Sequence, residues 1–215
     1  MERLEDVEEI HKVKPALLFI PDISGYTKFL HNTRLSDSKV LIHKLLEVLI
    51  DSNILQLKIG EIEGDAVVFY QLGPPPDIHT IECQVKKTFL DFQKALYEME
   101  QQDTLLATAK NLTLKIIVHY GEIITTDIKG IPKLLGPDLV LAHRILKNNI
   151  KIKEYLLMTE QYLQTQNKEG IKKAFSWSSQ HSGRKKYDHL GTVHYKYFPL
   201  TPLRSLLPEY DIVCR

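Results

Sequence analysis

The stretch ALLFIPDIS, residues 16–24, constrains the fold of this chain more than any other segment. A short continuous apolar run bounded by Pro15 and Gly25 is typical of a strand that is covered on both faces. The run nevertheless contains a carboxylate, Asp22, close to its end. We therefore predict a buried strand that carries Asp22 near the point where it leaves the core.

Strand and helix patterns alternate along the rest of the chain. Runs rich in β-branched and aromatic residues between turn signals predict strands over residues 54–62, 66–72, 112–121, 122–128, 154–159 and 189–200. Apolar residues at three- and four-residue spacing predict helices from Ser36 or Asp37, either of which could be the N-cap, to residue 53, and over residues 78–99 and 137–149. The polar stretch 164–186 is interpreted as a surface excursion.

The order of these elements predicts an α+β fold. The first six elements, βαββαβ, follow the split βαβ or ferredoxin-like arrangement, in which the first and third strands lie side by side at the centre of an antiparallel sheet. The helices pack on this sheet, and extra strands follow towards the C-terminus. The predicted strand pairs turn at residues 63–65 and at Gly121.

Length and charge limit the remaining possibilities. A chain of 215 residues suits one domain, and we expect it to span residues 1–215, with a core from about 16 to 200 and peripheral segments at 1–14 and 201–215. Because 28 basic residues face 27 acidic ones, the net charge of +1 predicts neither a nucleic-acid nor a membrane partner. The charged N-terminus and the lack of a long apolar run predict a cytoplasmic protein.

Two carboxylates are expected to converge in this topology. Asp22 lies near the end of the first strand and Asp65 at the start of the third, and these two strands are neighbours. Hard cations such as Mg²⁺ take carboxylate oxygens together with substrate phosphates and water. The alternative is that both aspartates serve only as turn formers.

Four segments together resemble the catalytic domains of class III nucleotidyl cyclases. FIPDISGYTKF is similar to the strand that ends in Asp-Ile-x-Gly-Phe-Thr in this family, and EIEGDAVVF to its Gly-Asp-Ala hairpin. LKIIVHYGEI resembles the fourth strand of the family, and GPDLVLAHRILKN resembles the helix that carries an arginine. The resemblance holds in register from residue 16 to about residue 150, with a weaker match in HLGTVHYKYFPL.

The resemblance implies roles for several residues. Asp22, Asp65 and the carbonyl of Ile23 match the ligands of two Mg²⁺ or Mn²⁺ ions, and Arg144 matches the arginine that stabilises the transition state. It implies substrate contacts for the turn Gly25, Tyr26 and Thr27 and for the base-recognition positions Glu61 and Lys133.

The chain also departs from the family. Val140 stands where catalytic members carry an asparagine that aligns the ribose, and Leu190 and Thr192 stand near the position of a phosphate-binding lysine. The pair of Glu61 and Lys133 matches neither the guanine nor the adenine pattern, and the two side chains could form a salt bridge. Other chemistry-bearing residues are interpreted as structural or solvated, namely Glu63, Cys83, His119, His143, residues 182–186 and Cys214. For Glu63, metal binding beside Asp65 is the alternative.

Two functions follow from the resemblance. One is a divergent nucleotidyl cyclase that binds divalent metal and a nucleoside triphosphate and turns it over weakly. The other is an inactive dimerisation, scaffolding or regulatory protein that keeps the fold. Because the family builds its active site between two head-to-tail subunits, a homodimer is expected, with a heterodimer left open. An unrelated ferredoxin-like module without metal remains a third possibility.

Overall fold

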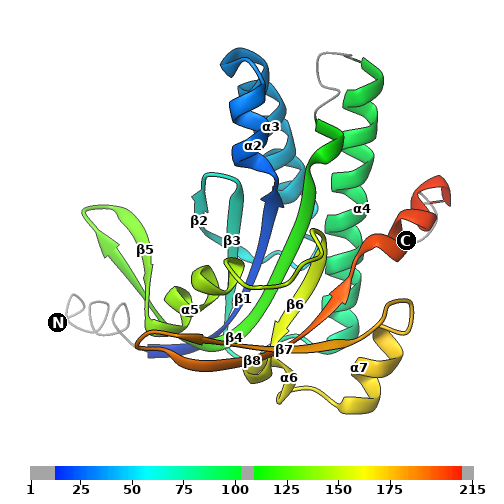
Figure 1. Cartoon of the computed structure of the whole chain (residues 1–215). Helices are drawn as coiled ribbons and strands as arrows, with labels where there is room; N and C mark the ends of the chain where they lie inside the picture. The colour runs from blue at the N-terminus through cyan, green and yellow to red at the C-terminus, as the bar shows by residue number, and fades with distance from the viewer. Residues whose placement is uncertain (1–12, 103–108, 210–215) are drawn as a thin grey trace.

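A central strand organises the computed structural model, which describes residues 13–102 and 109–209 (Figure 1). The strands are β1 (Val13–Ser24), β2 (Lys58–Glu63), β3 (Ala66–Leu72), β4 (Thr113–Ile128), β5 (Ile131–Leu135), β6 (Tyr155–Thr159), β7 (His181–Tyr187) and β8 (Gly191–Pro199). They form one sheet in the order β2-β3-β1-β4-β6-β8-β7, with β5 paired to β4. β1 runs antiparallel to both β3 and β4. The predicted α+β fold with its split βαβ arrangement is confirmed.

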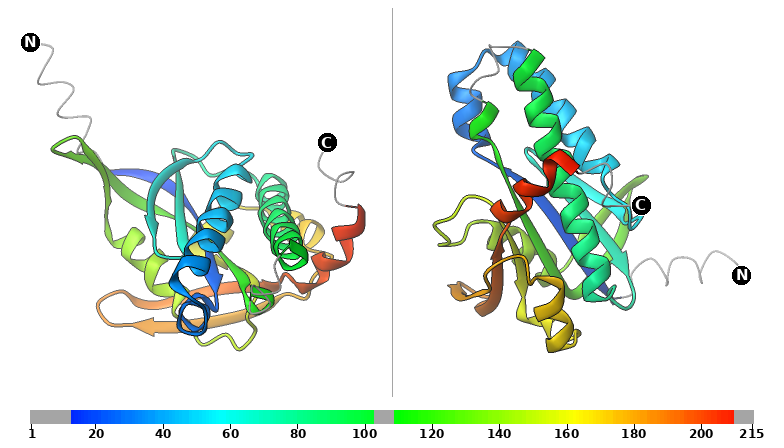
Figure 2. Two further views of the ribbon diagram at one scale, coloured as in Figure 1. Left: turned by 90° about the horizontal axis from the view of Figure 1, so that it is seen from above. Right: turned by 90° about the vertical axis from the view of Figure 1, so that its right-hand side faces the viewer.

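Helices cover both faces of the sheet (Figure 2). They are α2 (Tyr26–Asn32), α3 (Leu35–Asp51), α4 (Ile78–Gln102), α5 (Pro137–Leu146), α6 (Glu160–Leu163) and α7 (Lys168–Ala174), with short 3-10 turns η2 (Ala109–Asn111) and η3 (Thr201–Glu209). Leu17 and Phe19 of β1 join the core beneath α3 and α4, whereas Leu18 and Ile20 join the core beneath α5. Successive strand residues face opposite sides, so burial on both faces accounts for the unbroken apolar run.

The predicted strand pair around Gly121 is wrong, because residues 113–128 form one long strand. The hairpin lies further on, at Lys129 and Gly130, which have φ angles of 55° and 84°. Gly121 instead allows a close approach: a Cβ there would lie 2.3 Å from the Asp138 carboxyl carbon. A glycine inside a strand pattern thus marks a packing contact here and not a turn.

The polar stretch 164–186 is also more regular than predicted. It contains α7 and β7, and β7 pairs with β8 along its whole length from His181 to Tyr187. Polar and basic side chains suit a strand at the edge of a sheet, since they discourage pairing with another chain. The basic residues 182–186 therefore belong to an edge strand.

Several predicted boundaries also shift. The helix expected from Ser36 or Asp37 begins at Leu35 with Arg34 at the N-cap, so neither residue caps it. η3 packs against α4, and Leu203 within it is buried. Cys214 lies outside the described residues. No helix among residues 13–102 and 109–209 is long and apolar enough to cross a membrane.

A buried polar chain anchors α5 to the sheet. His119 of β4 is fully buried, with Nδ1 2.8 Å from the Thr159 hydroxyl and Nε2 3.0 Å from the Asp138 carboxylate. Asp138 also accepts a hydrogen bond of 2.7 Å from the backbone N–H of Glu122. A neutral imidazole has one donor and one acceptor, which matches a hydroxyl on one side and a carboxylate on the other.

We expect Asp138→Ala to destabilise the fold by about 2–3 kcal/mol, because it leaves the buried His119 imidazole and the backbone N–H of Glu122 without their acceptor. The measurement is urea denaturation. Asp51→Ala, at an exposed position of α3, is the matched control and should change stability by less than about 0.5 kcal/mol. An equal effect of the two changes would contradict an anchoring role for Asp138.

Candidate functional site

Asp22 and Asp65 meet in a cleft of about 580 Å³ at the ends of β1 and β3. The register places Asp22 opposite Ala66, and the backbone N–H of Ile23 donates to the carbonyl of Asp65 over 3.0 Å. This ladder holds the two carboxylates at neighbouring strand ends, as the topology predicted. Their role as metal ligands stays a prediction.

Both carboxylates have raised pKa values. Burial, followed by the charge of Asp22, raises the pKa of Asp65 to about 6. Burial also raises the pKa of Asp22, against the opposing effect of Lys115, whose Nζ lies 3.6 Å from Asp22 Oδ1. A cation placed between the carboxylates would favour their charged forms. Lys115 was not singled out from the sequence, because its place opposite Asp22 depends on the register of β1 and β4.

The turn from β1 into α2 forms one wall of the same cleft. Gly25 has a φ of 91°, in the left-handed region, and its carbonyl accepts from the N–H of Phe29 over 2.9 Å. A Cβ at Gly25 would lie 3.2 Å from the carbonyl oxygen of Asn111. Tyr26 and Thr27 begin the helix, and Gly25, Tyr26 and Thr27 all line the cleft, whereas the predicted base-recognition residues Glu61 and Lys133 do not. α2 itself was missed, because seven residues carry too little periodicity to indicate a helix.

Glu61 is held by two cationic or protonatable side chains. Lys133 Nζ donates to Glu61 Oε2 over 2.7 Å, and His143 Nε2 lies 2.9 Å from Glu61 Oε1. Burial alone would raise the pKa of Glu61, but these hydrogen bonds outweigh it and lower the pKa. The salt bridge considered for Glu61 and Lys133 is therefore present, and it occupies the position at which the family resemblance implies base recognition.

His143 faces a second carboxylate. Its Nδ1 lies 3.3 Å from Glu63 Oε2, while its Nε2 faces Glu61. A neutral imidazole has a single N–H and cannot donate to both, so a second proton or a metal ion would complete the arrangement. Ligand atoms of Glu61, Glu63 and His143 all lie within 4.8 Å of one another. From the sequence, Glu63 is interpreted as a solvated turn residue and His143 as structural, because only the packing of α5 on the sheet brings them together.

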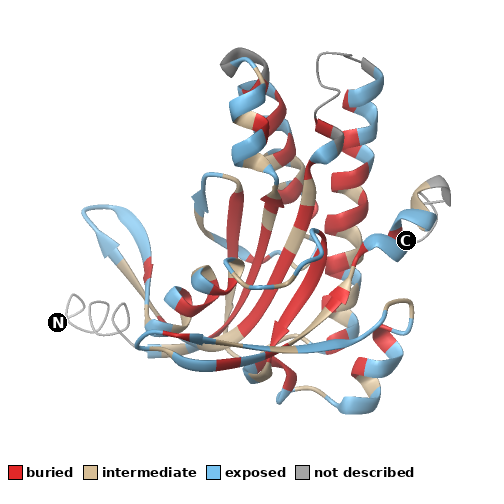
Figure 3. Cartoon of the chain, viewed as in Figure 1, coloured by how far each residue is buried: buried red, intermediate tan, exposed pale blue. Residues whose placement is uncertain are grey.

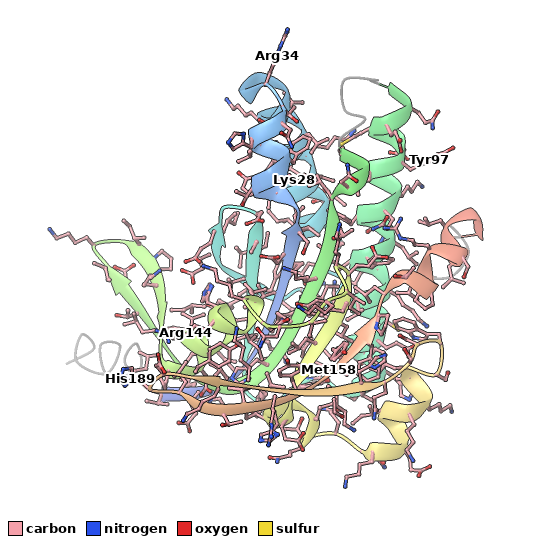
Figure 4. The ribbon with its side chains drawn as sticks, in the orientation of Figure 1. Lys28, Arg34, Tyr97, Arg144, Met158 and His189 are labelled. Atoms are coloured by element: carbon pink, nitrogen blue, oxygen red, sulfur yellow. The ribbon has the colours of Figure 1, made fainter. Side chains whose placement is uncertain are left out.

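Arg144 and Val140 lie on the outer side of α5. Arg144 is exposed and its Nη1 donates to the carbonyl of Asp188 over 3.4 Å, at the turn between β7 and β8. It does not line the cleft of Asp22 and Asp65, although His143 and Leu146 of α5 and the C-cap residue Lys147 do. Figure 4 shows Arg144 beside this turn, far from Lys28 at the start of α2. One chain therefore does not bring Arg144 to the two aspartates.

The raised pKa of Asp65 predicts a pH-dependent effect of Asp65→Asn in metal-free buffer. Because the folded pKa of about 6 exceeds the ordinary 3.8, the stability contributed by the protonated form is present at low pH and is lost as pH rises through 6. We expect the variant to be more stable than the wild type by about 1 kcal/mol near pH 7.5, after allowance for solvent screening, and equally stable near pH 4. Urea denaturation at both pH values checks this, and a pH-independent difference would contradict it.

The fold is shared with solved nucleotidyl cyclase domains. The guanylate cyclase domain of RhGC from Catenaria anguillulae, in complex with GTP, matches with a TM-score of 0.58 and 14% identity, covering 87% of this chain and 97% of that one. The adenylyl cyclase CyaB from P. aeruginosa gives 0.53 and 15%, covering 87% and 94%. A bacterial light-regulated adenylyl cyclase gives 0.58 and 14%, covering 92% and 98%. At such identities the likeness shows the fold alone, and the resemblance seen in the sequence is confirmed at that level.

Sequence comparison identifies one relative and one family model. An uncharacterized protein of Mycobacterium tuberculosis is 33% identical over 130 residues, which cover 54% of this chain and 56% of that protein. The chain thus spans little more than half the length of this relative. Residues 42–155, just over half of the 215, match the family model described as a protein of unknown function, DUF2652. The chain therefore belongs to the DUF2652 family.

Proposed function

We propose that this protein binds a divalent cation and a nucleoside triphosphate in the cleft of Asp22 and Asp65, and that it cyclises the nucleotide slowly. The observation that carries the proposal is the pair of half-buried carboxylates at adjoining strand ends, on the fold of nucleotidyl cyclase domains. The pKa of Asp65 is raised to about 6 partly by Asp22, so a cation would relieve a repulsion already present.

The available donors suit Mg²⁺ or Mn²⁺. The carboxylates of Asp22 and Asp65 and the carbonyl of Ile23 are hard oxygen ligands, and such sites are usually completed by water and substrate phosphates. A bound ion would neutralise charge on the phosphates and lower the pKa of an attacking hydroxyl. Lys115, 3.6 Å from Asp22, lies where it could contact a phosphate once the ion has replaced it beside the carboxylate.

The proposed reaction joins two oxygens of one nucleotide to the same phosphorus. The 3′-hydroxyl oxygen forms a bond to the α-phosphorus, and the bond from that phosphorus to the bridging oxygen breaks. Pyrophosphate leaves, and the hydroxyl proton passes to solvent. Arg144 would stabilise the negative charge on the transferring phosphoryl group, a role suited to a fixed guanidinium.

Arg144 can act there only from a second subunit. In one chain it faces the turn between β7 and β8, outside the cleft. Figure 3 colours parts of β2, the β4–β5 hairpin and α5 as exposed, and the exposed apolar side chains of these elements offer a surface for a homodimer. They are Ile59, Ile62, Ile128, Ile131, Leu135 and Val140. A head-to-tail dimer would bring α5 of one subunit to the aspartates of the other, and a heterodimer would do the same with a related chain.

The state of Glu61 and the identity of residues 140 and 192 favour a second candidate function, that of an inactive binding or scaffolding protein. Lys133 and His143 occupy both carboxylate oxygens of Glu61. Val140 is exposed and offers no hydrogen bond to a ribose. Thr192 stands near the position where the resembling family carries a phosphate-binding lysine. Such a protein would bind nucleotide without producing a cyclic monophosphate.

Incubation with each of the four ribonucleoside triphosphates and Mn²⁺, followed by mass spectrometry, separates the two candidates. We expect a cyclic product that disappears in Asp22→Asn, because the ion loses one of its carboxylates. Metal-dependent nucleotide binding without product would identify the binding protein. If neither binding nor product depends on metal, both the cyclase and the nucleotide-binding protein are wrong, and only a scaffolding role is left.

Val140→Asn should raise turnover about 10-fold or more, because it restores a polar contact at the position that aligns the attacking hydroxyl in the resembling family. Val40→Asn, at another exposed helical valine, is the matched control and should leave turnover unchanged. The readout is kcat from initial rates with the nucleotide that gives product. No gain in kcat would remove Val140 from the explanation of slow turnover.

A further inference from the structure

A second cleft adjoins the first across the turn from β1 to α2. It has a volume of about 410 Å³ and shares Ser24, Gly25, Lys28 and Lys115 with the cleft of the two aspartates. Its polar walls are strongly basic, and none of its lining residues is acidic. The basic residues are Lys28, Lys115, Lys151 and Lys153. Phe29 and Leu112, both buried, belong to its apolar lining.

Few acidic side chains balance the positive charge of these lysines. Lys115 pairs with Asp22 at 3.6 Å. Lys28, Lys151 and Lys153 form no ion pair with any acidic side chain in residues 13–102 and 109–209. The hydroxyl oxygen of Ser24 is buried and has no hydrogen-bond partner within the same ranges. Four lysines and the Ser24 hydroxyl therefore line the place where the β1–α2 turn meets the α5–β6 segment. This combination suits a polyanion.

The segment that carries Lys151 and Lys153 is held in place. The Thr113 hydroxyl donates to the Lys153 carbonyl over 3.2 Å, which ties the segment to the start of β4. At its other end, Asn148 Oδ1 accepts from the N–H of Ile150 over 2.9 Å. The lysines thus start from a fixed backbone, and ordering two side chains is the main entropic cost of binding an anion.

We propose that this lysine cleft binds the terminal phosphates of the nucleotide whose α-phosphate lies at Asp22 and Asp65. The inference rests on the proposed function. It assigns phosphate binding to lysines of the α5–β6 segment, because Leu190 and Thr192 stand near the position where the resembling family carries a phosphate-binding lysine. Lys115 lies at the junction of the two clefts, beside Asp22 and within both linings. Pyrophosphate, the leaving group, is the smallest ligand that the lysine cleft should hold.

Titration calorimetry with pyrophosphate in EDTA tests the cleft without any metal. The variant is Lys151→Ala with Lys153→Ala, and the matched control is Lys172→Ala with Lys173→Ala, which removes the same charge from two exposed positions of α7. We expect the Kd of the first double variant to rise about tenfold and that of the control to stay near the wild type, since only the first pair would contact the anion. Urea denaturation of both variants verifies that they fold.

The outcomes separate this inference from the proposed function. No pyrophosphate binding by the wild type, or an equal loss in the two double variants, overturns the lysine cleft. Manganese-dependent nucleotide binding that is unaffected by the Lys151 and Lys153 changes also overturns it, while it supports the nucleotide site. Pyrophosphate binding that depends on these lysines, with no metal-dependent nucleotide binding, supports an anion cleft and removes the proposed nucleotide.

Discussion

The pairing of β1 between β3 and β4 is the constraint on which the rest of the structure depends. Because β1 is buried on both faces, a charged group on it is tolerated only where the strand leaves the core, and Asp22 lies there. The same ladder fixes Asp65, whose carbonyl accepts from Ile23. The register therefore holds the two carboxylates close together, and the stability of the sheet offsets the repulsion between them.

α5 is the second element that positions chemistry, and its anchor is polar. The contact of Asp138 with His119 and Glu122 fixes the first turn of the helix. Residues 143 and 144 then point in different directions, because successive helical residues are about 100° apart. His143 reaches Glu61 and Glu63, whereas Arg144 faces the β7–β8 turn. α5 thus places His143 against β2 of its own chain and Arg144 on the outer surface.

Patterns that are local in the sequence predicted the fold well. The doubly buried strand, the turn at residues 63–65 and the long helix α4 each carry their own signal, and their order predicts that Asp22 and Asp65 converge. The single strand through Gly121 and the polar edge strand β7 were missed, since both depend on what packs beside them. The same holds for the contacts of Glu61 on β2, whose partners Lys133 and His143 come from β5 and α5.

Matches to the cyclase pattern and departures from it both occur on α5, where Arg144 matches the pattern and Val140 departs from it. The candidate metal ligands Asp22, Ile23 and Asp65, on β1 and in the turn before β3, match the pattern, whereas Leu190 and Thr192, before and within β8, do not. In the proposed head-to-tail pair, the aspartates of one chain and α5 of the other would serve the same active site. Binding of the nucleotide would then persist with slow turnover, and a related chain that retained the asparagine and lysine would complete the site as a heterodimer.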